Sequence, residues 1–443
     1  MIALIKAAQL ILSLSILVVL HELGHFIPAK WFKTRVEKFY LFFDWGFSLF
    51  KMKKGETEYG IGWLPLGGYV KISGMVDESM DTEALKQPAQ PWEFRAKPAW
   101  QRLIIMLGGV TVNLILGFFI YAMVLFVWGK TYITPEGVTY GLHVDERIRH
   151  FGFEEGDKIL KLDGVAPESY GQIRKLLLTN NVQEVTVERA GKTMNLQLPS
   201  DFGQALIDSN VRDPFAIRVP TVIDTVITGS PAEKAGLLKG DSLVAINQVK
   251  SIFFNDLADE IGKHKEEEIT VSLYRGGQPL DVKLTTTAEG KIGFGPISPA
   301  DRTDFAQIHK DFSVGSAITN GFTEAKETLQ GYVLSMRFLF SKSGAKQIGS
   351  FISIGSVFDA GWDWEIFWRT TAWLSLVLAF MNLLPIPALD GGHVVFLLYE
   401  MIAGKPAPQK FLEKAQMVGL ILLLSLMAYA IGNDIYRWLT DAF

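Results

Sequence analysis

Four stretches of the chain are almost entirely apolar, and each is long enough to cross a membrane as a helix. They are roughly Ile5 to Pro28, Leu103 to Trp128, Phe367 to Pro385 and Val418 to Ile435. A helix rises about 1.5 Å per residue, so about 20 apolar residues span the hydrocarbon core of a bilayer. The pattern predicts four transmembrane helices, while 20% charged residues exclude a chain that lies in the membrane throughout.

The long segment between the second and third apolar stretches contains a duplication. Gly152 to Leu160, with the sequence GFEEGDKIL, recurs 84 residues later as Gly236 to Val244, with the sequence GLLKGDSLV. Each copy continues into alternating apolar positions, a helical stretch and then strands around Val185 to Glu188 and Ile269 to Tyr274. A repeat of this length indicates two similar domains of about 85 residues each.

Two further segments have a readable pattern. Val36 to Met75 alternates apolar and aromatic residues with glycines, which predicts β-hairpins. A sheet edge beside the membrane could receive a substrate as an added strand, and a small solvated sheet without substrate contact is the alternative. Phe312 to Leu339 carries apolar residues at helical spacing, which predicts an amphipathic helix that lies on the outer membrane face or packs against the second repeat copy.

Lysine and arginine residues are concentrated between the first two apolar stretches and again between the last two. Since cytoplasmic connections carry an excess of these residues, both connections are expected on the cytoplasmic side. The two chain termini and the duplicated segment are then extracytoplasmic. The chain has no cysteine, so disulfides and thiolate ligands are excluded. The net charge of -4 says little about partners. We expect the lipid bilayer and membrane proteins as partners, and no nucleic acid.

His21, Glu22 and His25 form an H-E-x-x-H motif where the first apolar stretch ends. Histidines four residues apart project from one helix face and can bind a single zinc ion through their imidazoles. The glutamate between them can hold and deprotonate a water at the metal. Ionisable residues at membrane depth are costly, which favours this function over histidines that only satisfy polar groups at a helix end.

Asp390 is the candidate for a third ligand. It lies at the end of the third apolar stretch, in the sequence NLLPIPALDGGH. The two prolines break helical hydrogen bonding and the two glycines allow a tight turn, so the carboxylate can point inward. Two histidines and one aspartate would leave the fourth zinc position open, as catalysis requires. His393 is a rival ligand three residues later.

Together these motifs resemble the site-2 protease family of intramembrane zinc metalloproteases, over nearly the whole chain. H-E-x-x-H ends a first span, N-x-x-P-x-P-x-L-D-G-G ends a later one, and the copies between them resemble tandem PDZ domains, most closely in the stretch GSPAEKAGL of the second copy. The resemblance implies one Zn²⁺ per chain with His21, His25 and Asp390 as ligands and Glu22 as catalytic acid/base. It also implies substrate contacts by Asn382 and by a strand region. These strand residues are Gly67, Gly68, Tyr69, Val70 and Lys71.

Asn113, in the second apolar stretch, resembles a recurrent feature of the family for which we expect a packing role. Val110 stands where a proline is usual in the family, which affects only the local helix geometry.

The expected fold is a polytopic α-helical membrane protein with four transmembrane helices, a cytoplasmic membrane-associated β region and two extracytoplasmic PDZ domains. The predicted segments are 1–28 (first transmembrane helix), 29–100 (β-hairpin region), 101–128 (second transmembrane helix), 129–205 and 206–290 (PDZ domains), 291–364 (linker and amphipathic helical region), 365–392 (third transmembrane helix), 393–415 (cytoplasmic loop) and 416–443 (fourth transmembrane helix and C-terminal tail).

The implied activity is hydrolysis of peptide bonds within the transmembrane segment of single-span proteins in a bacterial inner membrane, during regulated intramembrane proteolysis in a stress response. Implied substrates are an anti-sigma factor already trimmed by a first protease and remnant signal peptides. The PDZ domains would bind peptide C-termini or exclude untrimmed substrates by size. The alternative is a membrane-anchored PDZ scaffold with a non-catalytic metal site, against which the intact Glu22 argues. A metal transporter is disfavoured because the spans show no inverted repeat.

Overall fold

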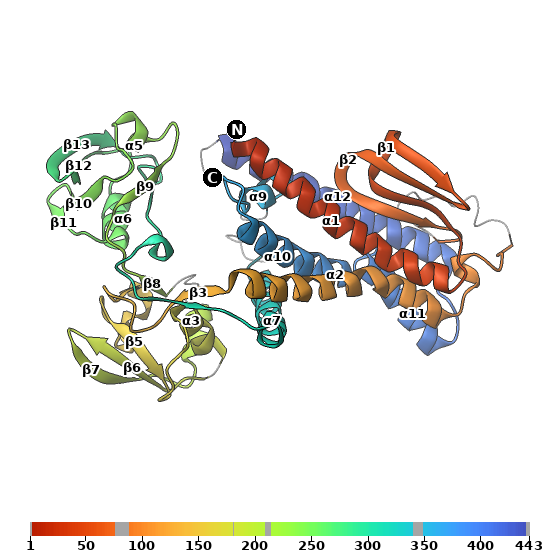
Figure 1. Cartoon of the computed structure of the whole chain (residues 1–443), viewed down its shortest axis with the longest axis horizontal. Helices are drawn as coiled ribbons and strands as arrows, with labels where there is room; N and C mark the ends of the chain where they lie inside the picture. The colour runs from red at the N-terminus through yellow and green to blue at the C-terminus, as the bar shows by residue number, and fades with distance from the viewer. Residues whose placement is uncertain (1, 76–87, 180, 209–213, 340–348, 440–443) are drawn as a thin grey trace. The chain divides into compact units, whose positions relative to one another are not determined.

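The computed structural model describes residues 2–75, 88–179, 181–208, 214–339 and 349–439 and divides into two compact units (Figure 1). The first unit combines Met1–Gly129 with Asp311–Phe443, and the second unit is Lys130–Lys310. The tail beyond residue 439 and part of the predicted 29–100 region lie outside the described residues.

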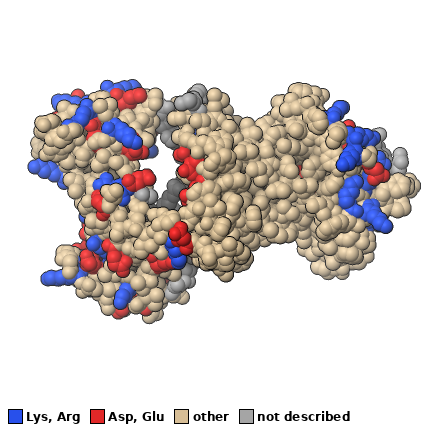
Figure 2. Space-filling model, viewed as in Figure 1, with Lys and Arg blue, Asp and Glu red and all other residues tan. Residues whose placement is uncertain are grey.

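The four predicted spans are confirmed as helices that are long and apolar enough to cross a membrane. They are α1 (Ile2–Trp31), α2 (Ala99–Trp128), α10 (Trp364–Leu383) and α12 (Gln409–Leu439). Figure 2 shows a broad surface of the helical unit without charged side chains, while Lys and Arg gather at the end where β1 and β2 lie. Such an uncharged belt is what the hydrocarbon core of a bilayer requires.

The helices α1 and α2 touch through their backbones. A Cβ atom built on Gly24 would lie 2.5 Å from the carbonyl oxygen of Gly108, and one built on Gly108 would lie 1.9 Å from the carbonyl oxygen of Gly24. Small residues allow membrane helices to approach this closely. Gly24 lies between the two histidines of the H-E-x-x-H motif, so the close crossing brings α2 against the predicted metal ligands.

Buried hydroxyl groups connect α10 to both of these helices. Thr371 donates a hydrogen bond to Oγ of Ser13 in α1 at 3.0 Å. Ser375 donates one to the carbonyl oxygen of Asn113 in α2 at 2.7 Å. Hydrogen bonds between helices compensate polar groups that lipid cannot satisfy, so these two contacts fix α10 beside the site.

The remaining helices of the first unit complete it. They are η2 (Phe94–Ala96), α7 (Val314–Leu339), α9 (Phe351–Ser356) and α11 (Asp390–Ala403). The predicted amphipathic helix corresponds to α7, which packs on α2, with Ala325 buried in a cluster with Ile120 and Tyr121. The predicted loop 393–415 is largely replaced by α11, because the polar residues that suggested a loop occur only after Ala403.

The predicted β-hairpins of Val36 to Met75 are confirmed as one antiparallel sheet made by β1 (Val36–Lys54) and β2 (Thr57–Ile72). Both strands bend back, so that Lys38 lies opposite Glu58 on one side and opposite Lys71 on the other. The sheet therefore has two edges, residues 48–54 and residues 64–72. The first edge carries exposed lysines, which discourage further strand pairing, whereas the second edge carries glycines and packs against α1.

The second unit contains two hydrophobic cores, one for each copy of the duplication. Around the first core lie β4 (Leu142–Val144), η3 (Glu146–Phe151), β5 (Lys158–Leu162), α3 (Tyr170–Thr179), β6 (Glu184–Arg189), β7 (Lys192–Gln197), α4 (Phe202–Asp208) and β8 (Phe215–Ile217). Around the second lie β9 (Ile223–Val226), α5 (Pro231–Lys234), β10 (Ser242–Ile246), β11 (Val249–Lys250), α6 (Phe254–Lys263), β12 (Glu268–Arg275), β13 (Gln278–Thr285) and β14 (Phe294–Pro296). The main sheets have the orders β5-β6-β7 and β11-β10-β12-β13.

The same buried ion pair occurs in both copies. Arg189, at the end of β6, binds both carboxylate oxygens of Asp157 at 2.7 and 2.8 Å, and Arg275, at the end of β12, binds those of Asp241 at 2.8 and 2.7 Å. Each aspartate is 0–1% exposed and also accepts a backbone N–H three residues earlier. The sequence repeat is therefore a repeat of structure as well.

The predicted boundary between 129–205 and 206–290 is too early. β8 pairs with β4, and Phe215 lies in the first core, so the first copy continues past residue 205. β14 pairs with β9 in the same way, which extends the second copy past residue 290. These closing strands have three residues each, too few for apolar alternation to reveal them. The unit ends with η4 (Pro299–Asp301) and β15 (Gln307–Lys310), which pairs with β3 (Lys130–Ile133).

Candidate metal centre

The structure brings together the two motif histidines and Asp390, which is the first residue of α11. Nε2 of His21 lies 3.2 Å from Nε2 of His25. Oδ2 of Asp390 lies 3.3 Å from the first of these nitrogens and 3.4 Å from the second. The three possible ligand atoms therefore face one point. They come from two helices, and His21 and Asp390 are 369 positions apart in the sequence.

These distances fit a zinc ion. Ligand atoms bound at about 2.0–2.1 Å around a tetrahedral zinc lie about 3.3–3.4 Å from one another. Asp390 Oδ2 is buried without a hydrogen-bond partner among the described residues, which is costly for a carboxylate unless a cation compensates it. The donor set of two imidazoles and one carboxylate is one that zinc accepts.

His25 is oriented by α2. Its Nδ1 atom lies 2.8 Å from the carbonyl oxygen of Ile105 and donates to it, since a carbonyl can only accept. The proton is then on Nδ1, and Nε2 keeps its lone pair toward the other two ligand atoms. Metal-binding histidines commonly have such a backbone partner, which fixes both the tautomer and the ring orientation.

Asn113 in α2 does more than pack. Its side-chain nitrogen lies 3.1 Å from Nδ1 of His21, and its side-chain oxygen is buried without a partner among the described residues. Amide oxygen and nitrogen are assigned from the hydrogen-bond network. With the amide turned over, Oδ1 of Asn113 accepts from Nδ1 of His21, and Nε2 of His21 keeps its lone pair for the metal. Sequence reasoning gave this residue only a packing role, because the contact depends on how α1 and α2 cross.

Gly109 forms the wall of the site on the α2 side. A Cβ atom built there would lie 2.4 Å from Nε2 of His25 and 2.6 Å from Cε1 of His21. Any side chain at this position would push the imidazoles out of place. In the sequence, the sign of this close packing is the glycine pair Gly108 and Gly109.

The segment before Asp390 is strained and closely packed. After α10 ends, Ala388 has a φ of 83°, which non-glycine residues rarely adopt. Gly391 was predicted to allow a tight turn, but its φ is not positive. Its role is close approach instead, since a Cβ atom there would lie 2.3 Å from the carbonyl oxygen of Leu384 and 2.4 Å from that of Leu383.

Glu22 lies beside the edge strand of the β1–β2 sheet. A Cβ atom built on Gly68 would lie 3.6 Å from Cγ of Glu22 and 2.6 Å from Cγ1 of Val18, so the backbone of β2 passes directly over this face of α1. Gly67 has a φ of 152°, and its space is limited by the ring of Phe43. The backbone at this edge is therefore the part of the sheet nearest the predicted catalytic glutamate.

The other predicted strand residues have partners within the sheet. Tyr69 stacks on Tyr40 and donates a hydrogen bond to Asp44 at 2.8 Å. Burial and this carboxylate raise the pKa of Tyr69, so it remains a neutral donor. Lys71 pairs with Glu37 at 3.8 Å. Val70 packs against a hydrophobic cluster that includes Ala29 and Ile72. The backbone of this strand, rather than these side chains, is thus oriented for a contact outside the sheet.

Asn382 also reaches the metal centre. Its Nδ2 lies 3.3 Å from Nε2 of His21, the atom that would bind the metal. An amide at this distance is close enough to touch a group bound beside the ion. His393, the rival ligand, is not a member of the ligand cluster formed by the described residues.

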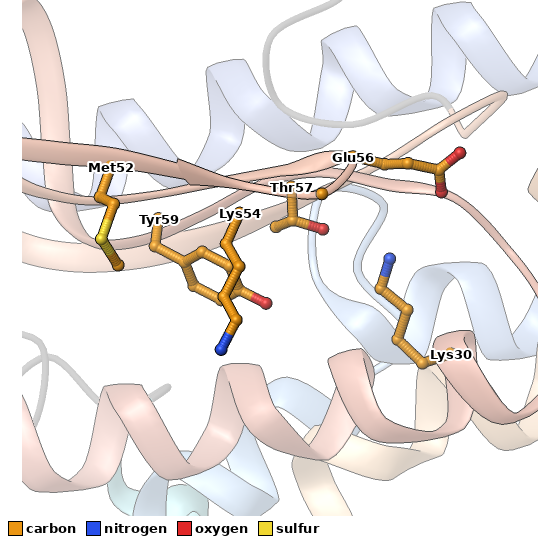
Figure 3. Close-up of a pocket in the computed structure, with 7 residues that line it drawn as sticks. Lys30, Met52, Lys54, Glu56, Thr57 and Tyr59 are labelled. Carbon is orange, nitrogen blue, oxygen red and sulfur yellow. The ribbon is translucent and has the colours of Figure 1, made fainter.

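Two other features do not form a comparable site. The cavity in Figure 3, of about 590 Å³, lies between the end of α1 and the β1–β2 turn, and its lining, which includes Lys30, Lys54 and Tyr59, contains none of the metal-centre residues. In the second unit His143, Glu155 and Asp256 lie within ligand distance of one another. Arg218 lies 3.1 Å from Asp256 and 3.8 Å from Glu155, so an arginine already supplies positive charge there.

Comparison with known proteins gives a consistent family. The family described as Peptidase family M50 matches residues 9–426. A putative zinc metalloprotease of Neisseria meningitidis is 29% identical, over 97% of this chain and 98% of that protein. The regulator of sigma E protease of Haemophilus influenzae is 28% identical over 96% and 98%, and the regulator of sigma-E protease RseP of Escherichia coli is 27% identical.

Proposed function

Because this chain belongs to peptidase family M50, the site-2 proteases, and is a zinc metalloprotease of the membrane, we propose that it hydrolyses peptide bonds within the transmembrane segments of single-span proteins. The observation that carries the proposal is the convergence of His21, His25 and Asp390 at the end of a membrane-length helix. A site at that position meets a substrate inside the bilayer rather than in water.

Each residue of the site has a chemical role in this proposal. His21, His25 and Asp390 would hold one zinc ion per chain. When bound, zinc supplies a Lewis acid that polarises a carbonyl group and makes water more acidic. Glu22 takes the proton of the attacking water and later delivers it to the nitrogen of the leaving amine. Asn382, beside His21, orients the substrate peptide at the site.

The β1–β2 edge would present the substrate in an extended form. A transmembrane helix hides its amides in its own hydrogen bonds, so it must unwind before cleavage. If the unwound substrate pairs with residues 64–72 as an added strand, its backbone forms hydrogen bonds to the sheet in place of those it lost. Lipid has no groups that could form these bonds. Gly67 to Lys71 supplies this edge, and the contact of Gly68 with α1 places the added strand close to Glu22.

The remaining features give the proposed setting. The β1–β2 sheet and the metal centre lie toward the cytoplasm of a bacterial inner membrane, on the side where Lys and Arg gather, and both termini are extracytoplasmic. The duplicated second unit consists of two extracytoplasmic PDZ domains that exclude untrimmed substrates by size or bind peptide C-termini. The substrates are single-span proteins trimmed by a first protease, of the anti-sigma factor type, and remnant signal peptides.

The test is a Glu22→Gln variant of the full chain. It keeps the shape of the side chain but cannot accept a proton, so it should bind zinc as the wild type does and fail to cleave a transmembrane peptide. Glu56→Gln, in the exposed β1–β2 turn, is the matched control and should cleave normally. Undiminished cleavage by Glu22→Gln would refute the assigned role.

A further inference from the structure

α12 supplies none of the proposed ligands, yet it contacts the segment that carries Asp390 at two adjacent points. Oε1 of Gln416 accepts a hydrogen bond from the backbone nitrogen of Ala388 at 3.1 Å. One turn further along α12, a Cβ atom built on Gly419 would lie 1.6 Å from the carbonyl oxygen of Pro387. The helix backbone therefore rests directly on the peptide two to three residues before Asp390.

The hydrogen bond from Ala388 to Gln416 satisfies a backbone N–H that is buried. Gln416 and Ala388 are 5% and 8% exposed. A buried backbone N–H without an acceptor is destabilising, and lipid provides no acceptor. Gln416 is the last polar residue before the apolar run of α12, and polar side chains of membrane helices hydrogen-bond to neighbouring segments.

The accepted amide belongs to a strained residue. A non-glycine residue with positive φ, such as Ala388 at 83°, is strained and persists only where its surroundings hold it. Gly391 and Gly392 press against the backbone of residues 383–387. Gln416 and Gly419 add two contacts from α12. Relaxation of Ala388 to negative φ would redirect the chain leading into Asp390.

We propose that Gln416 is a positioning residue for the metal centre, which holds Ala388 in its strained conformation and thereby aims the Asp390 carboxylate at His21 and His25. This inference rests on the proposed function of those three residues as zinc ligands. It makes α12 a part of the site: the helix sets ligand geometry through one hydrogen bond and one backbone contact.

The measurement is the zinc dissociation constant of the full-length protein in detergent, obtained by competition with a chelating dye. Gln416→Met keeps the length and flexibility of the side chain but removes the acceptor, and zinc should bind roughly 10- to 100-fold more weakly, the range found when a partner of a metal ligand is lost. Gln416→Glu keeps an acceptor oxygen and should restore most of the affinity. A side chain that only packs would not distinguish the two variants in this way.

Further variants keep the test decisive. Gly419→Ala pushes on the Pro387 carbonyl and should weaken zinc binding in the same direction, even if Gln416→Met does not fold. Ser425→Ala removes a hydroxyl that, among the described residues, donates to the Ile421 carbonyl oxygen within α12, and it should leave zinc affinity unchanged. Wild-type affinity in Gln416→Met, or equal weakening in Gln416→Met and Gln416→Glu, would overturn the inference. Asp390→Ala separates the two claims: if it binds zinc as the wild type does, the proposed metal centre itself fails.

Discussion

Asn113 lies with its side-chain amide 3.1 Å from Nδ1 of His21, so a polar residue of α2 controls the tautomer of a ligand in α1. His25 has the equivalent partner in the carbonyl oxygen of Ile105, also in α2. Loss of the Asn113 contact would leave the imidazole of His21 free to turn, and loss of the Ile105 contact would do the same for His25. The second transmembrane helix therefore orients both histidines although it contributes no ligand.

We expect Asn113→Leu to weaken zinc binding by roughly 10- to 100-fold, because Nδ1 of His21 loses the acceptor that leaves Nε2 free for the metal. Asn113→Asp provides a carboxylate oxygen at the same place and should bind zinc more tightly than Asn113→Leu. The measurement is again zinc competition with a chelating dye. Ser375→Ala, which removes only the hydrogen bond to the Asn113 carbonyl, is the control for general disturbance of the helix. Equal affinity in the wild type and Asn113→Leu would contradict the role.

Much of the site could be predicted from the sequence because its chemistry is local. His21, Glu22 and His25 lie within one helical turn, and Asp390 lies in a short proline-rich motif. The orienting contacts could not be predicted, because Asn113 meets His21 only through the backbone crossing at Gly24 and Gly108. A sequence shows that small residues are present, but not which helix approaches them.

The fold, like the site, has parts that could be predicted from local sequence and parts that could not. Long apolar runs gave the four spans, and a shared motif gave the duplication. The three-residue strands β8 and β14 escaped prediction, because what defines them is a partner strand far away in the chain. The positive φ of Ala388 could not be predicted either, since the residues that contact this segment include Gln416 in a separate helix.

Metal removal should inactivate the protein and loosen only the helical unit. Without zinc, Asp390 keeps a buried charge that no hydrogen bond compensates among the described residues. Chelation should abolish cleavage of a transmembrane peptide, and added zinc should restore it. Hydrogen exchange should become faster near residues 21–25 and 388–392, while residues 130–310 keep their protection. Unchanged exchange around the three ligands would argue against a metal there.

Gly68→Val should abolish strand presentation without loss of zinc. Its Cβ atom would lie 2.6 Å from both the Tyr40 carbonyl oxygen and Cγ1 of Val18, so the edge strand must leave α1. Cleavage of a transmembrane peptide should fall by about tenfold or more, since a misplaced substrate loses the benefit of proximity, while zinc affinity stays at the wild-type value. Gly262→Ala, in α6 with nothing within 4 Å of the added atom, is the control. A fully active Gly68→Val would remove the edge from the proposed mechanism.

The repeated ion pairs should stabilise both copies of the second unit alike. Arg275→Met leaves the buried Asp241 without its ion-pair partner, and it should lower the free energy of unfolding of the second copy by more than the loss of an exposed pair does. Arg189→Met should do the same for the first copy through Asp157. Lys239→Met removes an exposed pair with Asp224 and should cost less than about 1 kcal/mol. Hydrogen exchange of residues 130–310 in the full chain measures all three.

The effect of Arg275→Met should depend on pH. Burial opposes ionisation of Asp241, but hydrogen bonds from Arg275 and the Leu238 amide outweigh it and hold the pKa of Asp241 below its usual value. A carboxyl group with a lowered pKa contributes stability above its unfolded pKa and loses it as pH falls through the folded pKa. The difference between wild type and variant should therefore be full at pH 7 and shrink as the pH falls and Asp241 becomes protonated, first in the variant and then in the wild type. A difference that grows on acidification would contradict this account.

Removal of residues 131–309 should abolish discrimination between trimmed and untrimmed substrates if the second unit acts as a size filter. Its first and last residues, Lys130 and Lys310, lie opposite each other in the β3–β15 pair, so a linker of about four Gly and Ser residues can join them without strain. The shortened protein should cleave both substrates at similar rates and keep wild-type zinc affinity, since all proposed ligands are in the other unit. Continued dependence on trimming would reject the filter. Slower cleavage of the trimmed substrate would show instead that the second unit recruits it.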